Sequence, residues 1–221
     1  VEQRKNEEYE KLLSQARFLA LQSQINPHFL FNTLNSINRT VMLGRREQAL
    51  TMLDSLSVLL RYNLADAQMP ALLGEELGIT EEYLKIQKMR FSSRLNVDVR
   101  HDRKLEQAVT LPRFTLQPLV ENAVIHGLEP KEEGGTLILD VRKTGNYIRI
   151  RICDNGMGIE KERLERIRRR LSEKQPERIG VWNIWQRLSL YTGRDDSLKI
   201  MSKKGAGTIV SIYLHRGEED V

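Results

Sequence analysis

The stretch LQPLVENAVIHG, Leu116 to Gly127, combines an apolar helical pattern with three polar side chains. Its apolar residues recur at intervals of three and four, which predicts a helix with one face against a core: Leu116, Leu119, Val120, Ala123 and Val124. Glu121, Asn122 and His126 lie beside this stripe, where each needs a hydrogen-bond partner or a ligand. Asn122 offers a neutral oxygen to a hard cation, Glu121 can accept a proton or orient a water, and His126 follows one turn after Asn122. A helix end with hydrogen-bonded polar residues would explain the stretch equally well.

The N-terminal part of the chain has the pattern of a helical hairpin. Helical periodicity runs through residues 2–43, with leucines a heptad apart near its start, as at a coiled-coil entry, and Pro27 should bend or restart this helix. After Gly44, leucines at intervals of three and four predict a second helix: Leu50, Leu53, Leu56, Leu60 and Leu64. Neither helix can bury its apolar stripe alone. We therefore expect residues 1–68 to be a helical dimerisation region, a four-helix bundle made by two copies of the chain.

The pattern changes at the Met69–Pro70 break, and residues 69–221 predict a second domain of the α+β class. Helices are expected over Leu73–Arg94, from Pro112 through the stretch quoted above, and over Gly180–Tyr191. Strands are expected around Val97–Val99 and over Thr136–Lys143, Tyr147–Asp154, Ser197–Ser202 and Gly207–His215. Residues 159–179 are charged and are expected to be mobile. Helices covering one face of a sheet give a two-layer α/β sandwich.

The composition excludes several classes of protein. The chain has 221 residues, 40% of them hydrophobic and 29% charged, which is ordinary for a soluble globular protein. The net charge of +5 is only mildly basic. Its one basic cluster, in residues 166–170, alternates with Leu164, Ile167 and Leu171, so we expect the solvated side of an amphipathic helix. No aromatic-rich or recognition-helix pattern accompanies the charge, and a nucleic-acid partner is not expected.

Cys153 is the only cysteine, which rules out an intrachain disulfide and suits a reducing compartment. It lies in an apolar, strand-like run, so we expect a buried packing thiol rather than a nucleophile. No apolar run in these residues is long enough to cross a bilayer, and we expect no signal peptide among them. The sequence opens without methionine inside a helical pattern, as a piece of a longer protein would.

Three glycine-containing segments follow the Asn122 stretch. Asp154-Asn155-Gly156-Met157-Gly158 closes an apolar strand, and its acid could accept a hydrogen bond from an exocyclic amine such as that of adenine. Residues 179–183 open a helix, and residues 205–208 turn into a strand; helix starts and exposed backbone amides suit phosphate oxygens. Each segment alone is also compatible with a plain turn or an ordinary helix start.

The four sites in this order resemble the ATP-binding fold shared by histidine kinases, type II topoisomerases and their relatives. Residues 24–35, QINPHFLFNTLN, resemble the phosphoacceptor box of LytS/YesM-type sensor histidine kinases nearly residue for residue. The resemblance runs from about residue 15 to residue 215. A histidine beside proline on an apolar helix is more often a core residue, but the surrounding box reverses that expectation for His28.

This resemblance implies a role for each candidate residue. His28 would be the nucleophile that takes the γ-phosphoryl group of ATP. Asn122 would hold Mg²⁺, Glu121 would assist metal, water or proton transfer, and His126 would touch the phosphates. Asp154 would hydrogen-bond the adenine. The remaining candidates would shape or line the nucleotide pocket: Gly156, Gly158, Gly180, Asn183, Gly205, Gly207 and Thr208.

The same resemblance implies the place of the chain in a signalling system. We expect the cytoplasmic part of an inner-membrane sensor histidine kinase, whose missing N-terminal part holds the membrane anchor. It would autophosphorylate as a homodimer and pass the phosphoryl group to an aspartate in the receiver domain of a response regulator. Residues 159–179 would be a lid over ATP.

Phe29 stands where many histidine kinases carry an acid that serves as base, as is usual in this branch of the family. The base for His28 is therefore unassigned, with Asn32 as an orienting candidate. Two positions depart from the family pattern: Ile125, where lysine is common, and Arg178, where glycine is usual. The departures at Ile125 and Arg178 leave open a nucleotide-binding dimer scaffold without turnover. A third alternative is an ATPase of the topoisomerase or mismatch-repair type, against which the PHFLFN box argues.

Overall fold

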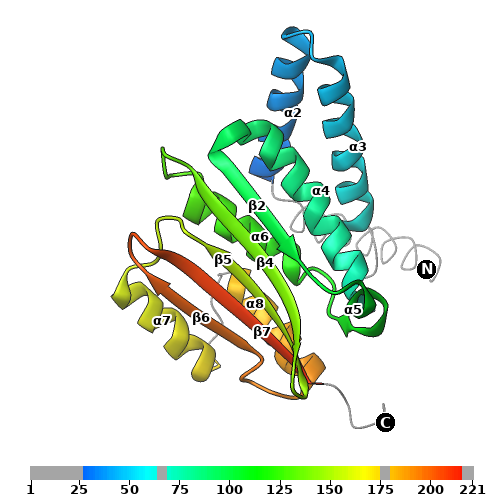
Figure 1. Ribbon diagram of the computed structural model, residues 1–221. Coiled ribbons are helices and arrows are strands. Elements are labelled where there is room, and N and C mark those ends of the chain that lie inside the picture. The colour runs from blue at the N-terminus through cyan, green and yellow to red at the C-terminus, as the bar shows by residue number, and fades with distance from the viewer. Residues whose placement is uncertain (1–26, 64–68, 175–179, 216–221) are drawn as a thin grey trace, which may run out of the picture. The chain divides into compact units, whose positions relative to one another are not determined.

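The computed structural model describes residues 27–63, 69–174 and 180–215 (Figure 1). The chain divides into two compact units, Val1–Asp66 and Ala67–Val221. The expected coiled-coil entry before Pro27 lies outside the described residues, as do Leu64 of the leucine stripe and Arg178.

Two helices, α2 (Pro27–Met42) and α3 (Arg46–Asn63), form the hairpin that the sequence predicts. Gly44 lies between them at a φ of 72°, a left-handed conformation that glycine adopts without a Cβ clash. The two helices contact each other, and their buried side chains recur at helical spacing: Phe29, Thr33 and Ile37 on α2, and Ala49, Met52, Leu56 and Leu59 on α3.

The leucine stripe of α3 is divided between two faces of the helix. Leu56 is buried, whereas Leu50 is 49% exposed and Leu53 is 41% exposed. Each step of three residues falls about 60° short of a full helical turn, so Leu56 lies about 120° around the helix from Leu50. On α2, Phe31 is 66% exposed. The hairpin thus buries one apolar face and leaves further apolar side chains on its surface.

The second unit contains a five-stranded sheet with the order β2-β4-β5-β7-β6. Only the β2–β4 pair is parallel; the other neighbours are antiparallel. The strands are β2 (Leu95–Arg100), β4 (Gly135–Thr144), β5 (Tyr147–Asp154), β6 (Leu198–Lys203) and β7 (Gly207–His215). The predicted hairpin of β4 and β5 is confirmed, and its register places Leu137 opposite Asp154.

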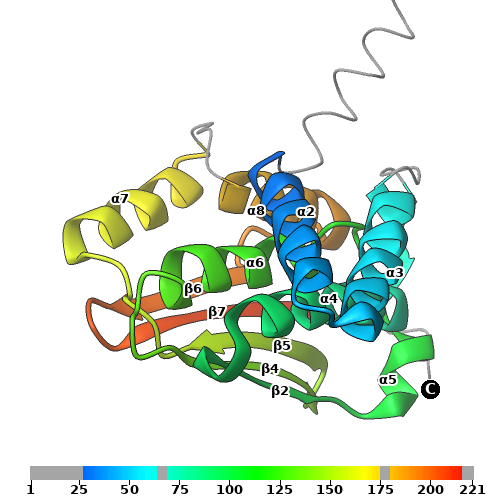
Figure 2. The same cartoon turned by 90° about the horizontal axis from the view of Figure 1, so that it is seen from above.

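Helices cover one face of this sheet (Figure 2). They are α4 (Leu73–Phe91), α6 (Leu116–Asn122), which continues directly as the π-helix η2 (Ala123–Leu128), and α8 (Gly180–Thr192). Alternate strand residues are buried beneath them, among them Leu137, Leu139, Ile150 and Ile212. The residues between these, such as Arg149 and Cys153, face the other side and are half-buried. The predicted two-layer α+β architecture is therefore confirmed.

The region expected to be mobile contains a helix, α7 (Lys161–Ser172). Leu164 and Ile167 are buried, and the helix contacts the edge strand β6. The Arg168 guanidinium donates two hydrogen bonds, of 3.0 and 2.7 Å, to the Ile200 carbonyl of β6. The predicted amphipathic helix is confirmed, and burial of its apolar stripe holds it on the sheet edge.

Several short elements carry too few residues to show a sequence pattern. They are β1 (Ala71–Leu72), which pairs with β3 (Thr110–Leu111), the 3-10 helix η1 (Ser92–Arg94) and α5 (Arg103–Ala108). The helix expected from Pro112 begins only at Leu116, because residues 112–115 form a turn in which Phe114 has a φ of 60°. In that turn the Thr115 hydroxyl donates to the Pro112 carbonyl at 2.6 Å.

Candidate functional site

A cavity of about 330 Å³ lies in the second unit between the helical layer and the sheet. Its polar lining comes from α6, η2, β5, α7 and β7: Asn122, His126, Asp154, Arg163 and Thr208. Gly158, Gly180 and Val181 add backbone, and the apolar lining includes Ala123, Ile152, Ile167, Ile200 and Val210. The structure therefore brings together polar side chains that are up to 86 positions apart in the sequence, from Asn122 to Thr208.

Asn122 and His126 face this cavity from one continuous helix. Asn122 is the last residue of α6, and His126 lies in the π-helical turn that follows. A π-turn is wider than an α-turn, so side chains four residues apart stay on the same side of the helix. The start of α8 approaches them, because a Cβ added to Gly180 would lie 3.9 Å from the Asn122 side-chain nitrogen.

Asp154 ends β5 on the face of the sheet that the helices cover, and its side chain is only 8% exposed. Its Oδ1 accepts the Gly156 N–H at 2.9 Å, and the Thr208 N–H also bonds to it. Burial raises the pKa of the Asp154 carboxyl, and these two backbone hydrogen bonds oppose the rise. A carboxylate held in an apolar wall can accept a hydrogen bond from a ligand amine at the same place.

Glycines allow backbone segments to pack around Asp154. A Cβ on Gly127 would lie 2.8 Å from the Asp154 Oδ1, and one on Gly207 would lie 1.9 Å from the Asp154 carbonyl oxygen. A Cβ on Gly156 would lie 2.2 Å from the Gly127 carbonyl oxygen, which also accepts the Met157 N–H at 2.9 Å. Backbone from other segments therefore occupies the space beside these glycines, and the glycines fix the position of the carboxylate.

Several sequence-predicted residues lie outside the cavity lining. Glu121 is half-buried and faces α4. Burial raises the pKa of Tyr83 on α4, and the negative charge of Glu121 raises that pKa further. Asn183 is exposed on α8. Gly205 lies in the β6–β7 turn and donates its N–H to the Met157 carbonyl at 2.7 Å. With Gly156 and Gly207, these residues surround the site without facing the cavity.

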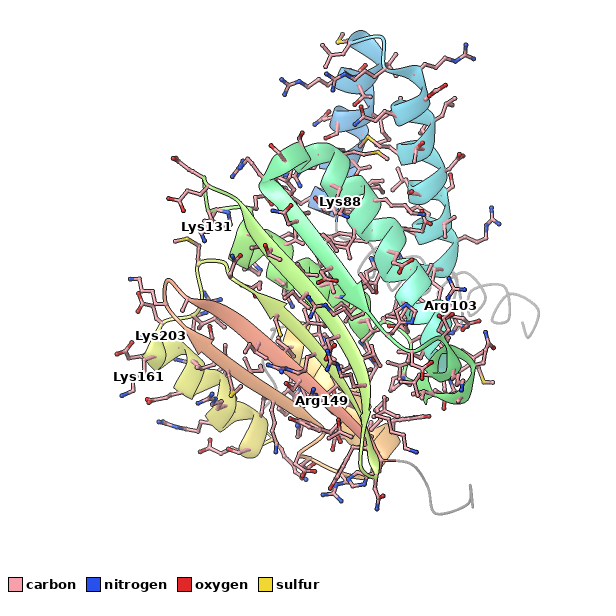
Figure 3. The ribbon with its side chains drawn as sticks, in the orientation of Figure 1. Lys88, Arg103, Lys131, Arg149, Lys161 and Lys203 are labelled. Atoms are coloured by element: carbon pink, nitrogen blue, oxygen red, sulfur yellow. The ribbon has the colours of Figure 1, made fainter. Side chains whose placement is uncertain are left out.

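Arg163 is the lining residue that sequence reasoning missed. It extends from α7, which the sequence predicts as part of a mobile stretch rich in arginine, so nothing distinguished it from its neighbours. Figure 3 shows three further cations, Lys131, Lys161 and Lys203, at the end of the sheet where β4 begins and β5 ends. Lys131 donates to the Asn155 carbonyl at 3.0 Å. Cations gathered at one end favour an anionic ligand.

His28 lies on α2 in the first unit and is exposed. The Asn32 side-chain nitrogen, one helical turn on, lies 3.1 Å from the His28 Nε2 and 3.3 Å from its Nδ1. The amide nitrogen is nearly equidistant from the two ring nitrogens, so this contact can restrain the ring but does not distinguish its tautomers. Asn32 as the residue that orients His28 stays a prediction.

The described residues contain no cluster of three or more metal-ligating His, Cys, Asp or Glu side chains. Mg²⁺ bound to a nucleotide takes most of its ligands from phosphates and water and needs only one or two protein oxygens. Within the described ranges, no helix has the length and apolar character needed to span a bilayer. Cys153 is half-buried rather than buried, and burial raises the pKa of its thiol, which disfavours the nucleophilic thiolate.

These features define an ATPase-type α/β domain preceded by a helical hairpin that carries an exposed histidine. Residues 16–95 match the family described as histidine kinase, and residues 108–218 match the family described as histidine kinase-, DNA gyrase B- and HSP90-like ATPase. The chain belongs to the histidine kinase family, as the sequence resemblance indicated. Membership of the ATPase family implies that the second unit binds ATP.

Three relatives illustrate the similarity. Sensor histidine kinase YesM of Bacillus subtilis is 35% identical over 209 residues, covering 95% of this chain and 35% of YesM. Sensor histidine kinase YpdA of Escherichia coli is 33% identical over 211 residues, covering 94% and 36%. Sensor protein LytS of Oceanobacillus iheyensis is 35% identical over 214 residues, covering 95% and 36%. The chain therefore spans about a third of the length of these relatives.

The cavity fits ATP in both size and chemistry. Its volume of about 330 Å³ lies within the usual range of small-molecule sites. The apolar lining offers a surface for a purine, and the buried Asp154 carboxylate supplies an acceptor for its amine. Asn122, His126 and Arg163 supply a neutral oxygen, an imidazole and a guanidinium, the groups that suit a phosphate-bound metal and phosphate oxygens.

Proposed function

We propose that the protein containing this chain is a sensor histidine kinase that autophosphorylates on His28 and passes the phosphoryl group to an aspartate of a response regulator. The observation that carries this proposal is the pairing of two features in one chain. One is an exposed histidine in the phosphoacceptor box, and the other is an ATPase-family cavity with its polar residues facing inward. We propose that movement of one unit relative to the other brings the histidine to the nucleotide.

The base end of the nucleotide would bind at Asp154. Its carboxylate is positioned by the N–H groups of Gly156 and Thr208 and would accept a hydrogen bond from the adenine amine. Ile152 and Val210 on neighbouring strands would contact the purine face. A buried acceptor favours adenine, because guanine presents a carbonyl oxygen at the equivalent position and would leave the carboxylate unpaired.

The phosphate end would bind between α6, η2 and α7. Asn122 would hold Mg²⁺, which neutralises charge on the phosphates as the γ-phosphoryl group leaves. His126 and Arg163 would contact phosphate oxygens, and Arg163 would supply from α7 the positive charge that Ile125 does not provide. Gly158, Gly180 and Thr208 would line the nucleotide, with Asn183, Gly205, Gly207 and Gly156 supporting the surrounding turns.

Transfer would begin with a neutral His28 imidazole, because only an unprotonated ring nitrogen carries the lone pair that attacks phosphorus. A nitrogen–phosphorus bond forms, the bond from the γ-phosphorus to the bridging oxygen breaks, and its electrons leave with ADP. Asn32 would restrain the orientation of the ring. Glu121 remains the proposed carboxylate for metal, water or proton transfer. It adjoins Asn122 in the chain but lies outside the cavity lining, so Glu121→Gln is needed to test it.

The first unit would dimerise through the apolar surface of its hairpin. Leu50, Leu53 and Phe31 are exposed there, and a second copy packed against them would complete a four-helix bundle. Residues 1–68 would then be the dimerisation and phosphotransfer region, and residues 69–221 the catalytic region. We further propose that the parts of the protein beyond this chain anchor it to the plasma membrane, with this region in the cytoplasm.

One assay tests the proposal against its alternatives. The protein is incubated with γ-labelled ATP and Mg²⁺, and the label on the protein is followed together with released phosphate. A kinase gives acid-labile label that is lost in His28→Gln and kept in His215→Gln, a control at an exposed histidine outside the cavity. Bound nucleotide without label indicates a scaffold. Released phosphate without labelled protein indicates an ATPase of the topoisomerase or mismatch-repair type.

A further inference from the structure

A buried carboxylate from one helix caps the start of another in the second unit. Glu76 of α4 is 1% exposed. Its Oε1 accepts the Phe114 N–H at 2.7 Å, and its Oε2 accepts the N–H groups of Thr115 and Leu116 at 2.9 and 2.8 Å. All three donors belong to the backbone at the beginning of α6.

This arrangement replaces a cap that α6 lacks. The first N–H groups of a helix have no partner within the helix, and they are commonly satisfied by a side chain just before it. Thr115 occupies that position, but its side chain makes no cap and donates to Pro112 instead. A carboxylate from a different helix supplies the missing acceptors, and its negative charge also complements the positive end of the helix dipole.

Arg187 of α8 holds the same turn from the other side. Its guanidinium donates to the Phe114 carbonyl at 2.6 Å. Burial lowers the pKa of Arg187, and attraction to the Glu76 carboxylate opposes that fall. Helix α6 therefore begins at a point fixed by one charged side chain from α4 and one from α8.

Contacts further along α4 show that it runs parallel to the helix carrying Asn122. Tyr83, seven residues after Glu76, lies within electrostatic range of Glu121. Arg90, seven residues after Tyr83, forms an ion pair with Glu129, just beyond the end of η2. Residues separated by seven lie on nearly the same side of a helix. One face of α4 therefore contacts the helix formed by α6 and η2 near the start, the middle and the end of that helix.

We infer that Glu76 is a positioning residue for Asn122: it sets the start of α6 and, through it, where the Asn122 side chain meets the nucleotide-bound metal. This inference rests on the proposed function. Glu76 is not among the residues that line the cavity, and it would act through the helix backbone. Asn122 follows Leu116 by six residues, less than two turns, so a shift or fraying at the helix start reaches Asn122 directly.

The experiment compares nucleotide binding with and without Mg²⁺. The dissociation constant of a fluorescent, non-hydrolysable ATP analogue is measured for the complete protein in excess Mg²⁺ and in EDTA. The dissociation constant in EDTA divided by that in Mg²⁺ reports how much the metal strengthens binding. Asn122→Ala provides the reference in which this contribution is lost. The test variant is Glu76→Gln, which places an NH₂ group against backbone N–H donors. The matched control is Glu75→Gln, on the adjacent, more exposed residue that pairs with Arg113.

We expect Glu76→Gln to reduce the ratio about tenfold, as is typical when support of a metal ligand is lost, and Glu75→Gln to leave it unchanged. Equal weakening of both dissociation constants, or an unchanged ratio, overturns the inference, because a purely structural cap affects binding regardless of metal. If Glu76→Gln does not fold, Glu76→Asp takes its place as the test variant. It keeps the charge on a shorter side chain and should also reduce the ratio. Failure of both variants to fold would overturn the inference and assign Glu76 a structural role only. Absence of analogue binding by the wild type refutes the proposed function itself.

Discussion

Replacing Asp154 with asparagine should weaken ATP binding strongly. The N–H groups of Gly156 and Thr208 already bond to this side chain, so the asparagine oxygen would stay with them and its NH₂ would face the adenine amine. The ligand then loses a hydrogen bond to a charged acceptor, which contributes about 1.5–3 kcal/mol. That free energy corresponds to about a 10- to 150-fold rise in the dissociation constant.

The same substitution should stabilise the empty domain at neutral pH. Because burial raises the pKa of Asp154 in the folded state, the folded protein holds this proton more tightly than the unfolded chain does. Stability therefore falls as the pH rises from the pKa of Asp154 in the unfolded chain to its higher pKa in the folded protein. Above that higher pKa the loss of stability is complete. Asparagine carries no charge and avoids that loss, so Asp154→Asn should melt at a higher temperature than wild type at neutral pH. The difference should vanish at acidic pH.

Isothermal titration with ATP and GTP analogues, together with melting curves across pH, measures both effects. We expect a lower ATP affinity and a smaller preference of ATP over GTP, because the asparagine NH₂ can donate to the guanine carbonyl. Wild-type ATP affinity in Asp154→Asn would refute the assignment of this carboxylate to the base. A neutral-pH melting temperature below that of wild type would refute the stability argument while leaving the binding argument in place.

Three further outcomes are expected. Gly127→Ala places a Cβ 2.8 Å from the Asp154 carboxylate and should cost about 1–3 kcal/mol of unfolding free energy in a denaturant titration, whereas Gly78→Ala, with open space at its Cβ, should not destabilise. Arg163→Gln should raise the dissociation constant for ATP about two- to fivefold at low salt, and the corresponding change at Arg166 should leave it unaltered; equal effects would contradict a specific phosphate contact. Leu53→Glu should convert the dimer to a monomer in sedimentation velocity, and a persisting dimer would place the interface elsewhere.

The sequence predicted the elements whose patterns are long. The spacing of apolar residues from Leu116 onward predicts its helix. In β4 and β5, apolar and polar residues alternate, as expected for a sheet covered on one face. His28 and Asn122 could be singled out because each lies in a segment that resembles a family motif. Short elements such as α5 give no such signal, because six residues contain less than two helical turns.

The directions in which side chains point were beyond prediction from the sequence. Glu121 and Asn122 are adjacent, yet only Asn122 lines the cavity, because successive residues on a helix point about 100° apart. Arg163 is one of several similar arginines, and only docking of α7 on β6 determines which one faces the cavity. The sequence did not reveal that backbone from other parts of the chain packs directly against Gly156 and Gly207.

Helix α7 also protects the sheet from unwanted pairing. Strand β6 is an outer strand, bonded to β7 on one side only, and such a strand can recruit a foreign chain through its free backbone groups. The guanidinium of Arg168 donates hydrogen bonds to one of those groups, the Ile200 carbonyl. If α7 swings outward to admit or release nucleotide, that carbonyl loses its partner and the apolar side chains beneath the helix meet water. A kinase held open in this way would be prone to self-association, so nucleotide that keeps α7 seated should also keep the protein in solution.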